Sequence, residues 1–551
     1  MAKLTITSLM LVIIFNVTIA KANNADPPPR LVAYRDTYIL FAKYNPNPPA
    51  LADYSTRLAS ELSTDEQVID KLESEFQISG KLILKSTLFN NRDYLSIAYT
   101  QQSFWQVYNK PVSAPFRDTN YEPELIYTWL PNDKSIVNNR WQLKAVSLGF
   151  SHQANGSQDE LSRSWERVYA QFDAAYNNFQ LSFKPWLPVG PETNQGEEFT
   201  DYYGYGELSM AYLFGEPTCP NKVSVMGRNN LKSNNKGAFD LRLSYCVSQS
   251  FSLYAKYFNG YGESLLDYNF HNQSFGLGLS LNRIPASDDL IQNHEIWQYA
   301  GMSLFRDNYI LPVKYNPSPS IPDLKGGLSG EQPENMEVEF QISFGIMLPF
   351  KLFTDNDNIN IAYSQQTFWQ PYKRSGDSIR ETNYEPEIFY QWNQPDNDLS
   401  QTAWSPSWVR LGLVHESNGQ AQLRSRSWNR IYTEFNFDLG EPLDIGKLNL
   451  AIKPWYRFKE EAEDDDNPNM EDYYGYGELS VDLEFSKYHR LNLLARNNLK
   501  RDNKGAIDVR WSYPISSELS IYLKYFNGYG ESLIDYNKHN QSLGLGFAIN
   551  H

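Results

Sequence analysis

The feature that most constrains the fold of this 551-residue chain is an internal duplication. Several segments of the first half recur in the second: RDTYIL at 35–40 as RDNYIL at 306–311, TNYEPE at 119–124 and 382–387, DYYGYGE at 201–207 and 472–478, and YFNGYGES at 257–264 and 525–532. The period of roughly 265 to 270 residues is far longer than that of a solenoid repeat, which is about 20 to 50. The chain is therefore expected to fold as two copies of one whole domain.

The ends of the two copies can be placed from local composition. Lys3, the apolar run 9–15 and the small residues before position 23 predict a signal peptide over 1–22, so the mature chain leaves the cytoplasm. Around Pro285 the apolar alternation lapses, which predicts a linker. The predicted organisation is signal peptide 1–22, first copy 23–282, linker 283–299 and second copy 300–551.

Within each copy the residues alternate as in β-strands. In the run 409–415 (VRLGLVH), positions 409, 411 and 413 are aliphatic, whereas 410 and 412 are Arg and Gly. An arginine opposite three aliphatic side chains is typical of a strand between a polar lumen and lipid. A soluble β-sandwich with one buried face would show the same alternation. The signal peptide and the aromatic content of 15% favour an all-β fold of two tandem antiparallel transmembrane β-barrels.

Overall polarity is consistent with such barrels. No uninterrupted run of about 18 apolar residues follows the signal peptide, and the mean hydropathy is -0.55, which argues against membrane helices. A net charge of -16 without a basic cluster makes nucleic acid an unexpected partner. The two cysteines, Cys219 and Cys246, flank one predicted hairpin, and either a disulfide or two free thiols would suit them.

One predicted hairpin brings together residues that could act on an ester. On the strand that contains His415, the side chains of His415 and Ser417 share the lipid-facing side with the aliphatic residues. On the next strand Asn429 also faces lipid, and residues 415 and 429 are symmetric about the turn. We therefore expect His415 and Asn429 to be cross-strand neighbours, with Ser417 beside them.

These three side chains have the chemistry of a nucleophile, a base and an orienting group. The Ser417 hydroxyl can attack an ester carbonyl, His415 can accept its proton, and the Asn429 amide can fix the imidazole tautomer. An amide suits this position because an ionised carboxylate facing hydrocarbon would cost several kcal/mol. Taken alone, the pattern His-x-Ser would equally suit polar rim groups that bind lipid headgroups.

The segments HESNG at 415–419 and RSRSWNR at 424–430 resemble the active-site signature of outer-membrane phospholipase A. TNYEPE, KPW at 453–455 and GYGESLIDYN at 528–537 resemble the same family, so the likeness covers nearly all of each copy. The resemblance implies a twelve-stranded barrel per copy in the bacterial outer membrane. It also implies hydrolysis of acyl esters of phospholipids and lysophospholipids, activated by calcium and dimerisation, with Ser417 as nucleophile, His415 as base and Asn429 as orienting residue.

The first copy departs from this signature. It retains His152, but Ala154 stands where the second copy has the serine, and Glu166 stands where it has the asparagine. Without a hydroxyl no acyl-enzyme can form. The first copy is therefore expected to be catalytically inactive.

The resemblance also implies a calcium site completed by two barrels, because the family's ion is bound between two subunits. Transferred to this chain, the ligands of the second copy are the Gln420 carbonyl and Ser425, and the third ligand is Ser113 of the first copy. The corresponding position in the second copy is Gly376. We expect a covalent pseudo-dimer with one working site, and the sequence leaves open whether two whole chains form a further homodimer.

Two other functions remain compatible with a barrel. The second copy could also be inactive, which would make the protein a porin-like or structural barrel, or the barrel could carry fatty acids or lipids. Joint retention of Ser417, His415 and Asn429 in one copy favours the hydrolase.

Overall fold

A computed structural model describes most of the chain. The described residues are 30–49, 69–86, 88–89, 92–109, 115–131, 141–157, 161–190, 192, 198–285, 297–299, 302–324, 332–348, 350–373, 378–395, 405–420, 424–441, 446–460, 465–486, 489–516 and 519–550. The predicted signal peptide, the ligand Ser113 and Gly376 lie outside these residues.

The first barrel is an antiparallel sheet that closes on itself. Its strands are β2 (Tyr38–Tyr44), β3 (Leu72–Ser86), β4 (Asp93–Trp105), β5 (Phe116–Trp129), β6 (Gln142–Ala154), β7 (Ser164–Tyr176), β8 (Phe179–Pro188), β9 (Gly206–Glu216), β10 (Cys219–Asn229), β11 (Gly237–Cys246), β12 (Phe251–Tyr261) and β13 (His271–Leu281). Each strand pairs with the next in the chain, and β13 pairs with β2, which closes a ring of twelve among the described residues. A short strand β1 (Arg30–Ala33) pairs with β3, and helix α3 (Thr200–Tyr203) lies between β8 and β9.

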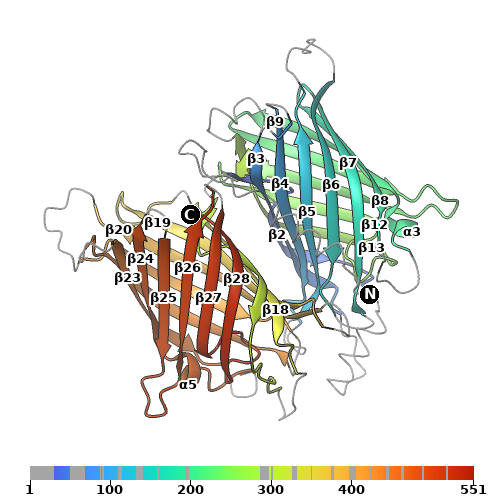
Figure 1. Ribbon diagram of the computed structural model, residues 1–551. Coiled ribbons are helices and arrows are strands. Elements are labelled where there is room, and N and C mark those ends of the chain that lie inside the picture. The colour runs from blue at the N-terminus through green and yellow to red at the C-terminus, as the bar shows by residue number, and fades with distance from the viewer. Residues whose placement is uncertain are drawn as a thin grey trace. The chain divides into compact units, whose positions relative to one another are not determined.

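The second barrel repeats this order. Its strands are β17 (Tyr309–Tyr315), β18 (Met336–Leu348), β19 (Asp357–Gln370), β20 (Ser378–Asn393), β21 (Trp408–Ser417), β22 (Ser427–Asp438), β23 (Lys447–Phe458), β24 (Gly477–Ser486), β25 (His489–Asn497), β26 (Gly505–Pro514), β27 (Leu519–Tyr529) and β28 (His539–Ile549). Strand β28 pairs with β17 and closes this ring (Figure 1). Strand β16 (Met302–Leu304) adds to β18, and helix α5 (Glu471–Tyr474) precedes β24.

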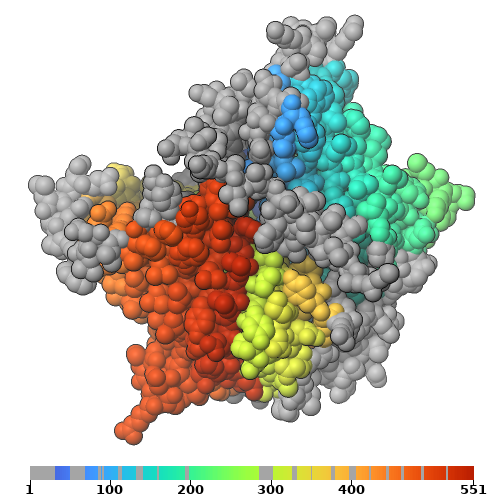
Figure 2. All heavy atoms as spheres, in the orientation of Figure 1, coloured from blue at the N-terminus to red at the C-terminus, as the bar shows by residue number. Residues whose placement is uncertain are grey.

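The walls of both barrels show the predicted alternation. On β21, Leu411 and Leu413 are each 49% exposed, whereas the next residue, Val414, points to the other face and is buried. The space-filling view shows the outer surface of the second barrel over β26, β27 and β28 in red (Figure 2). A closed barrel with an apolar outside and a polar inside is the arrangement in which strands cross a bilayer. The predicted all-β fold of two antiparallel transmembrane barrels is confirmed.

A glycine on the lumen side of β21 makes room for the core of the second barrel. A Cβ atom on Gly412 would lie 2.5 Å from Cζ of Tyr432 on β22, so any other residue would displace the buried tyrosine ring. Tyr432 packs in a cluster that includes Trp428, Trp455 and Tyr474. The absence of a side chain at position 412 therefore lets the Tyr432 ring of β22 pack against β21 inside the barrel.

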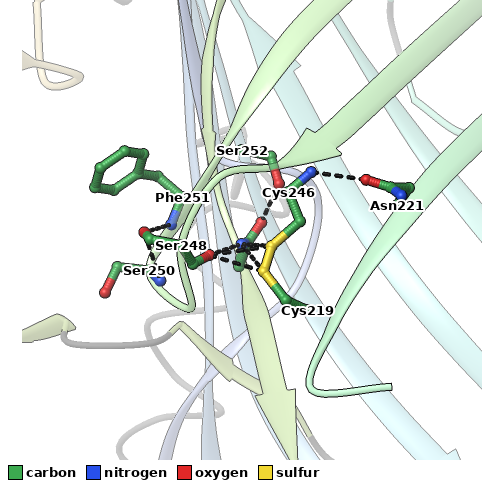
Figure 3. Close-up of a disulfide and its surroundings, with 8 residues drawn as sticks. Cys219, Asn221, Cys246, Ser248, Ser250, Phe251 and Ser252 are labelled. Carbon is green, nitrogen blue, oxygen red and sulfur yellow. Dashed lines mark hydrogen bonds between the residues drawn. A yellow bond between two sulfur atoms is a disulfide. The ribbon is translucent and has the colours of Figure 1, made fainter. Parts of the chain in front are cut away.

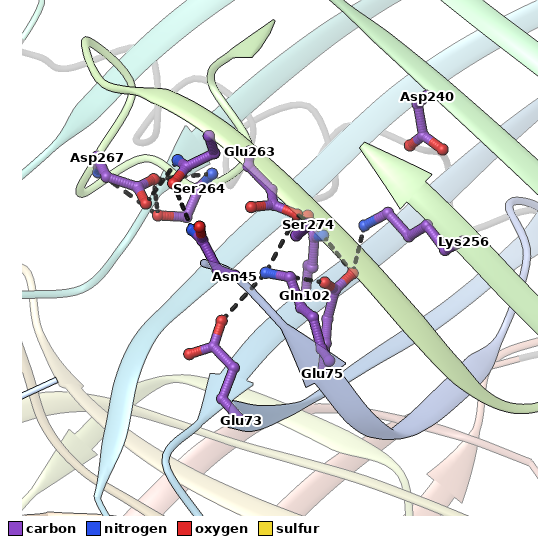
Figure 4. Close-up of polar contacts among 12 residues, drawn as sticks. Asn45, Glu73, Glu75, Gln102, Asp240, Lys256, Glu263, Ser264, Asp267 and Ser274 are labelled. Atoms are coloured by element: carbon purple, nitrogen blue, oxygen red, sulfur yellow. Dashed lines mark hydrogen bonds and ion pairs between the residues drawn. The ribbon is translucent and has the colours of Figure 1, made fainter. Parts of the chain in front are cut away.

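Each lumen is filled by buried ion pairs. In the second barrel, Lys314 Nζ lies 2.9 to 3.0 Å from carboxylate oxygens of Glu337, Glu339 and Glu531, and the lysine side chain is 1% exposed. In the first barrel, Lys43 Nζ contacts Glu73, Glu75 and Glu263 in the same way. Figure 4 shows these three carboxylates converging across the first lumen, where Lys256 also reaches Glu75. Charges in such an interior must be paired, so the barrel is packed inside.

A disulfide and a short pair of strands lie within residues 219–299. Cys219 and Cys246 form a disulfide that joins the ends of β10 and β11, with a Cα–Cα distance of 5.7 Å (Figure 3). In the predicted linker, β14 (Arg283–Pro285) pairs with β15 (Trp297–Tyr299). Among the described residues, neither of the helices is long and apolar enough to cross a membrane.

Candidate active site

The pair His415 and Asn429 is formed by the register of two neighbouring strands. His415 on β21 lies directly opposite Asn429 on β22, and its Nδ1 is 2.9 Å from the Asn429 Oδ1. An amide oxygen only accepts, so this contact requires the imidazole to carry its proton on Nδ1. The other ring nitrogen, Nε2, is then the one that can accept a proton from a nucleophile.

Ser417 is placed by strand alternation on the same side as His415. It is two residues further along β21, and it lies opposite Ser427 on β22 and Tyr384 on β20. Because the exposed residues Leu411 and Leu413 share this phase, the hydroxyl and the imidazole face the outside of the barrel. Both residues are partly exposed, so a molecule outside the barrel can approach them without entering the lumen.

The residue between them, Glu416, points inward and anchors the strand. Its Oε2 accepts hydrogen bonds from Trp428 Nε1 at 2.9 Å and from Arg430 Nη2 at 2.7 Å. The Arg430 guanidinium also stacks on the Trp428 ring at 3.8 Å. The inward residues of β21 and β22 are thus locked to each other, which holds the outward His415 and Asn429 in register.

The turn beyond Ser417 begins with a buried asparagine. Asn418 Oδ1 accepts from the backbone N–H of Arg426 at 3.0 Å, and its Nδ2 donates to Glu381 Oε1 at 3.0 Å. The next residue, Gly419, has φ of 61°, a conformation that favours glycine. The serine therefore stands at the end of a strand whose exit is fixed by side-chain hydrogen bonds.

The comparisons with known proteins agree on one family. The family model described as phospholipase A1 matches residues 16–281 and matches again at 289–549. The chain belongs to the phospholipase A1 family. Each match covers one copy, so the predicted tandem duplication is confirmed.

Individual relatives of this phospholipase A1 homologue match about half of it. A phospholipase A1 of Escherichia coli strain K12 is 34% identical over 258 residues, which are 47% of this chain and 83% of that protein. One from Klebsiella pneumoniae is 38% identical over 212 residues, 38% of this chain and 71% of that protein.

Two solved structures are similar at 32% identity. The outer membrane phospholipase A of Escherichia coli has a TM-score of 0.41, and the match covers 46% of this chain and 98% of that one. The outer membrane phospholipase of Salmonella typhi, described as a dimer with bound calcium, has a TM-score of 0.41 over 46% and 92%. With its two membrane barrels, this phospholipase A1 homologue is a bacterial outer-membrane protein.

The first barrel of the homologue has the same hairpin with different chemistry. His152 on β6 lies opposite Glu166 on β7, and its Nδ1 is 3.5 Å from Glu166 Oε1. Ala154 lies opposite Ser164, at the position that corresponds to Ser417 of the second copy. An imidazole and a carboxylate are therefore paired on this hairpin, but the side chain of residue 154 ends at a methyl group.

The residues predicted to bind calcium are described only in part. Ser425 is buried, and the side chain of Gln420 accepts a hydrogen bond from Arg424 Nε at 2.7 Å. Within the described ranges, no group of three or more His, Cys, Asp or Glu residues is arranged to hold a metal. The predicted site uses hydroxyl and carbonyl oxygens instead, which are donors that calcium accepts.

Sequence reasoning missed one side chain beside the candidate site. The Asn429 Nδ2 donates to Glu460 Oε1 at 3.2 Å, and Glu460 lies two residues beyond the end of β23. Alternation gives no signal for a residue outside a strand. The only available clue is the pairing of β22 with β23, which places the end of β23 next to Asn429.

Proposed function

We propose that this chain is a calcium-dependent outer-membrane phospholipase A with a single working active site, formed by Ser417, His415 and Asn429 of the second barrel. The observation that carries the proposal is the 2.9 Å contact between His415 and Asn429 on the lipid-facing side of β21, next to a serine. The substrates are membrane phospholipids and lysophospholipids, whose ester bonds lie at the depth of the bilayer interface.

The reaction follows from these groups. The Ser417 Oγ attacks the ester carbonyl carbon while His415 Nε2 takes the hydroxyl proton. The His415 imidazolium then gives this proton to the departing glycerol oxygen, which leaves the fatty acyl group on Ser417. Water, deprotonated by the same nitrogen, releases the fatty acid and restores the serine. Asn429 Oδ1 accepts from Nδ1–H throughout and keeps the ring oriented.

Calcium is proposed from the family resemblance and from the chemistry of its ligands. The Gln420 carbonyl, the Ser425 hydroxyl and the Ser113 hydroxyl would hold it, and all three are neutral oxygen donors of the kind calcium binds. When bound, the ion supplies positive charge for the negative oxygen that develops during acyl transfer. The ligand set takes Ser113 from the first copy, so we propose that the two barrels act as a pair.

The packed lumen argues against the porin-like alternative. Lys314 and its three carboxylates occupy the interior of the second barrel with exposed fractions of 8% or less. A solute path would have to break these ion pairs, each of which stabilises charges that have no access to bulk water. These buried ion pairs stabilise the wall of the second barrel, on whose outer face the candidate site lies.

The test is release of fatty acid from phosphatidylcholine in mixed micelles by the refolded full chain, with calcium and with a chelator. Ser417→Ala is expected to lower the rate by more than about 1000-fold, because the nucleophile is lost. The matched control is Ser407→Ala at the other end of the same hairpin, where the hydroxyl donates to Asn436 Oδ1 at 2.8 Å. No hydrolysis by the parent under any condition would leave a structural barrel as the better account.

A further inference from the structure

The Asn429 side chain is held at both of its ends. Its oxygen faces His415, and its nitrogen donates to the Glu460 carboxylate at 3.2 Å. Glu460 reaches this position because β22 pairs with β23, with Asn429 opposite Phe458, the last residue of β23. Glu460 is partly exposed there.

An amide can be turned by 180° without changing its shape, so its orientation depends on its neighbours. The Nδ1–H of His415 is a donor and needs the amide oxygen. An ionised carboxylate only accepts and needs the amide nitrogen. In the reversed orientation two donors would face each other at His415 and two acceptors at Glu460. Both neighbours therefore select the orientation that leaves Oδ1 for the imidazole.

A carboxylate costs less at the site of Glu460 than at the strand position of Asn429. Asn429 stands on the lipid-facing side of a strand, where a charge is costly. Glu460 lies beyond the strand end, and Arg457 and the loop residues Asp465 and Asp466 contribute to its electrostatic surroundings. Burial and these two aspartates raise the pKa of Glu460, while Arg457 lowers it. The Glu460 carboxylate thus lies outside the strand and contacts the amide that faces the imidazole.

The first barrel shows a different solution at the same place. There the carboxylate belongs to the strand residue itself, Glu166, which is 3.5 Å from His152. Gly190 lies close to this carboxylate: a Cβ atom on Gly190 would lie 2.8 Å from Glu166 Oε2. A symmetric carboxylate offers an oxygen in either orientation and needs no second residue to select one. The second barrel, with an amide, does need one.

We propose that Glu460 is a positioning residue for the Ser417, His415 and Asn429 site, and that it acts by fixing the orientation of the Asn429 amide. This inference rests on the proposed function. It goes beyond the family's triad because it assigns a role to a residue of this chain's loop after β23.

The test is a double-mutant cycle on the full chain with calcium present, measuring kcat and KM for fatty-acid release. Glu460→Ala is expected to lower kcat about tenfold, because a charge-assisted hydrogen bond to the amide is lost, with KM within about twofold. In an Asn429→Ala background the same change is expected to have no further effect on kcat. Glu460→Gln keeps an oxygen acceptor and is expected to recover most of the loss.

The control is Asp502→Asn, in the loop between β25 and β26. Asp502 Oδ1 also accepts from an asparagine amide, Asn498 Nδ2, at 2.8 Å, but neither residue touches the candidate site. An active parent whose kcat is unchanged by Glu460→Ala would overturn the inference, as would an equal loss with and without Asn429. A Gln variant as slow as the Ala variant would also overturn it. An inactive parent would instead mean failure of the proposed function.

Discussion

Removing the Asn429 amide tests the arrangement of the site directly. In Asn429→Ala, the 2.9 Å contact to His415 Nδ1 is lost, so the imidazole loses the hydrogen bond that orients it. A hydrogen bond to a group that becomes charged is worth about 1.5 to 3 kcal/mol. Because about 1.4 kcal/mol changes a rate tenfold, kcat is expected to fall about 10- to 150-fold.

The assay is the initial rate of fatty-acid release from phosphatidylcholine mixed micelles at saturating calcium. The Michaelis constant is expected to stay within about twofold, because Asn429 contacts the base and not the lipid. Asn436→Ala is the matched control: this amide lies on the same strand, and its Oδ1 accepts from Ser407 Oγ at 2.8 Å at the far end of the hairpin.

Two results would refute this reasoning. One is a kcat for Asn429→Ala within threefold of the parent, which would mean that the amide does not hold the imidazole. The other concerns the double variant with His415→Ala. Because Asn429 acts only through His415, the double variant should be no slower than His415→Ala alone, and multiplied losses would show an independent role.

Three further predictions follow from the fold and the proposed site. Lys314→Met removes one ion pair from each of three buried carboxylates, of which Glu337 keeps Arg380 and Glu339 keeps Lys524, and it should lower the free energy of unfolding in detergent by about 3 to 5 kcal/mol. Lys447→Met, whose ion pair is about half exposed, should change the free energy of unfolding by less than about 1 kcal/mol, and equal urea midpoints for the two variants would contradict the buried network. The unfolded, unreduced chain should show no free thiols, and removing the Cys219–Cys246 bond, which closes a 27-residue separation, should lower the unfolding free energy of the first barrel by about 3 to 4 kcal/mol without changing hydrolysis. Chelation should abolish fatty-acid release, and Ser425→Ala should raise the calcium concentration needed for half-maximal rate; a rate indifferent to calcium would exclude the proposed metal site.

The two barrels share several interior contacts. Lys43 and Lys314 occupy the same lumen position and each contacts three carboxylates. Gly149 and Gly412 both leave space for a tyrosine ring on the next strand. Interior packing is therefore the same at these positions of both copies, whereas the hairpin residues Ala154 and Glu166 differ from Ser417 and Asn429. The chain therefore contains two copies of the barrel, but only the second copy has a serine, a histidine and an asparagine together at the three candidate positions.

Part of this protein could be read from its sequence because the relevant interactions are local or periodic. Strand alternation has a period of two, so the outward placement of Leu411, Leu413 and His415 follows from their numbers. A hairpin fixes its own register, so the pairing of residues 415 and 429 was predictable from the position of the turn. Long identical segments revealed the duplication without any structural information.

Only the tertiary structure decided the contacts that join distant parts of the chain. Lys314 contacts Glu531 inside the closed barrel. The pattern of residues along a strand does not predict which charged side chains form ion pairs there. The sequence allows either a disulfide or two free thiols at Cys219 and Cys246, because the separation of two cysteines along the chain does not give the distance between their strands. The sequence does not predict the contact of Glu460 either, because Glu460 lies beyond the end of a strand, where side chains no longer alternate between two faces. Only the tertiary structure shows that its carboxylate meets the Asn429 amide.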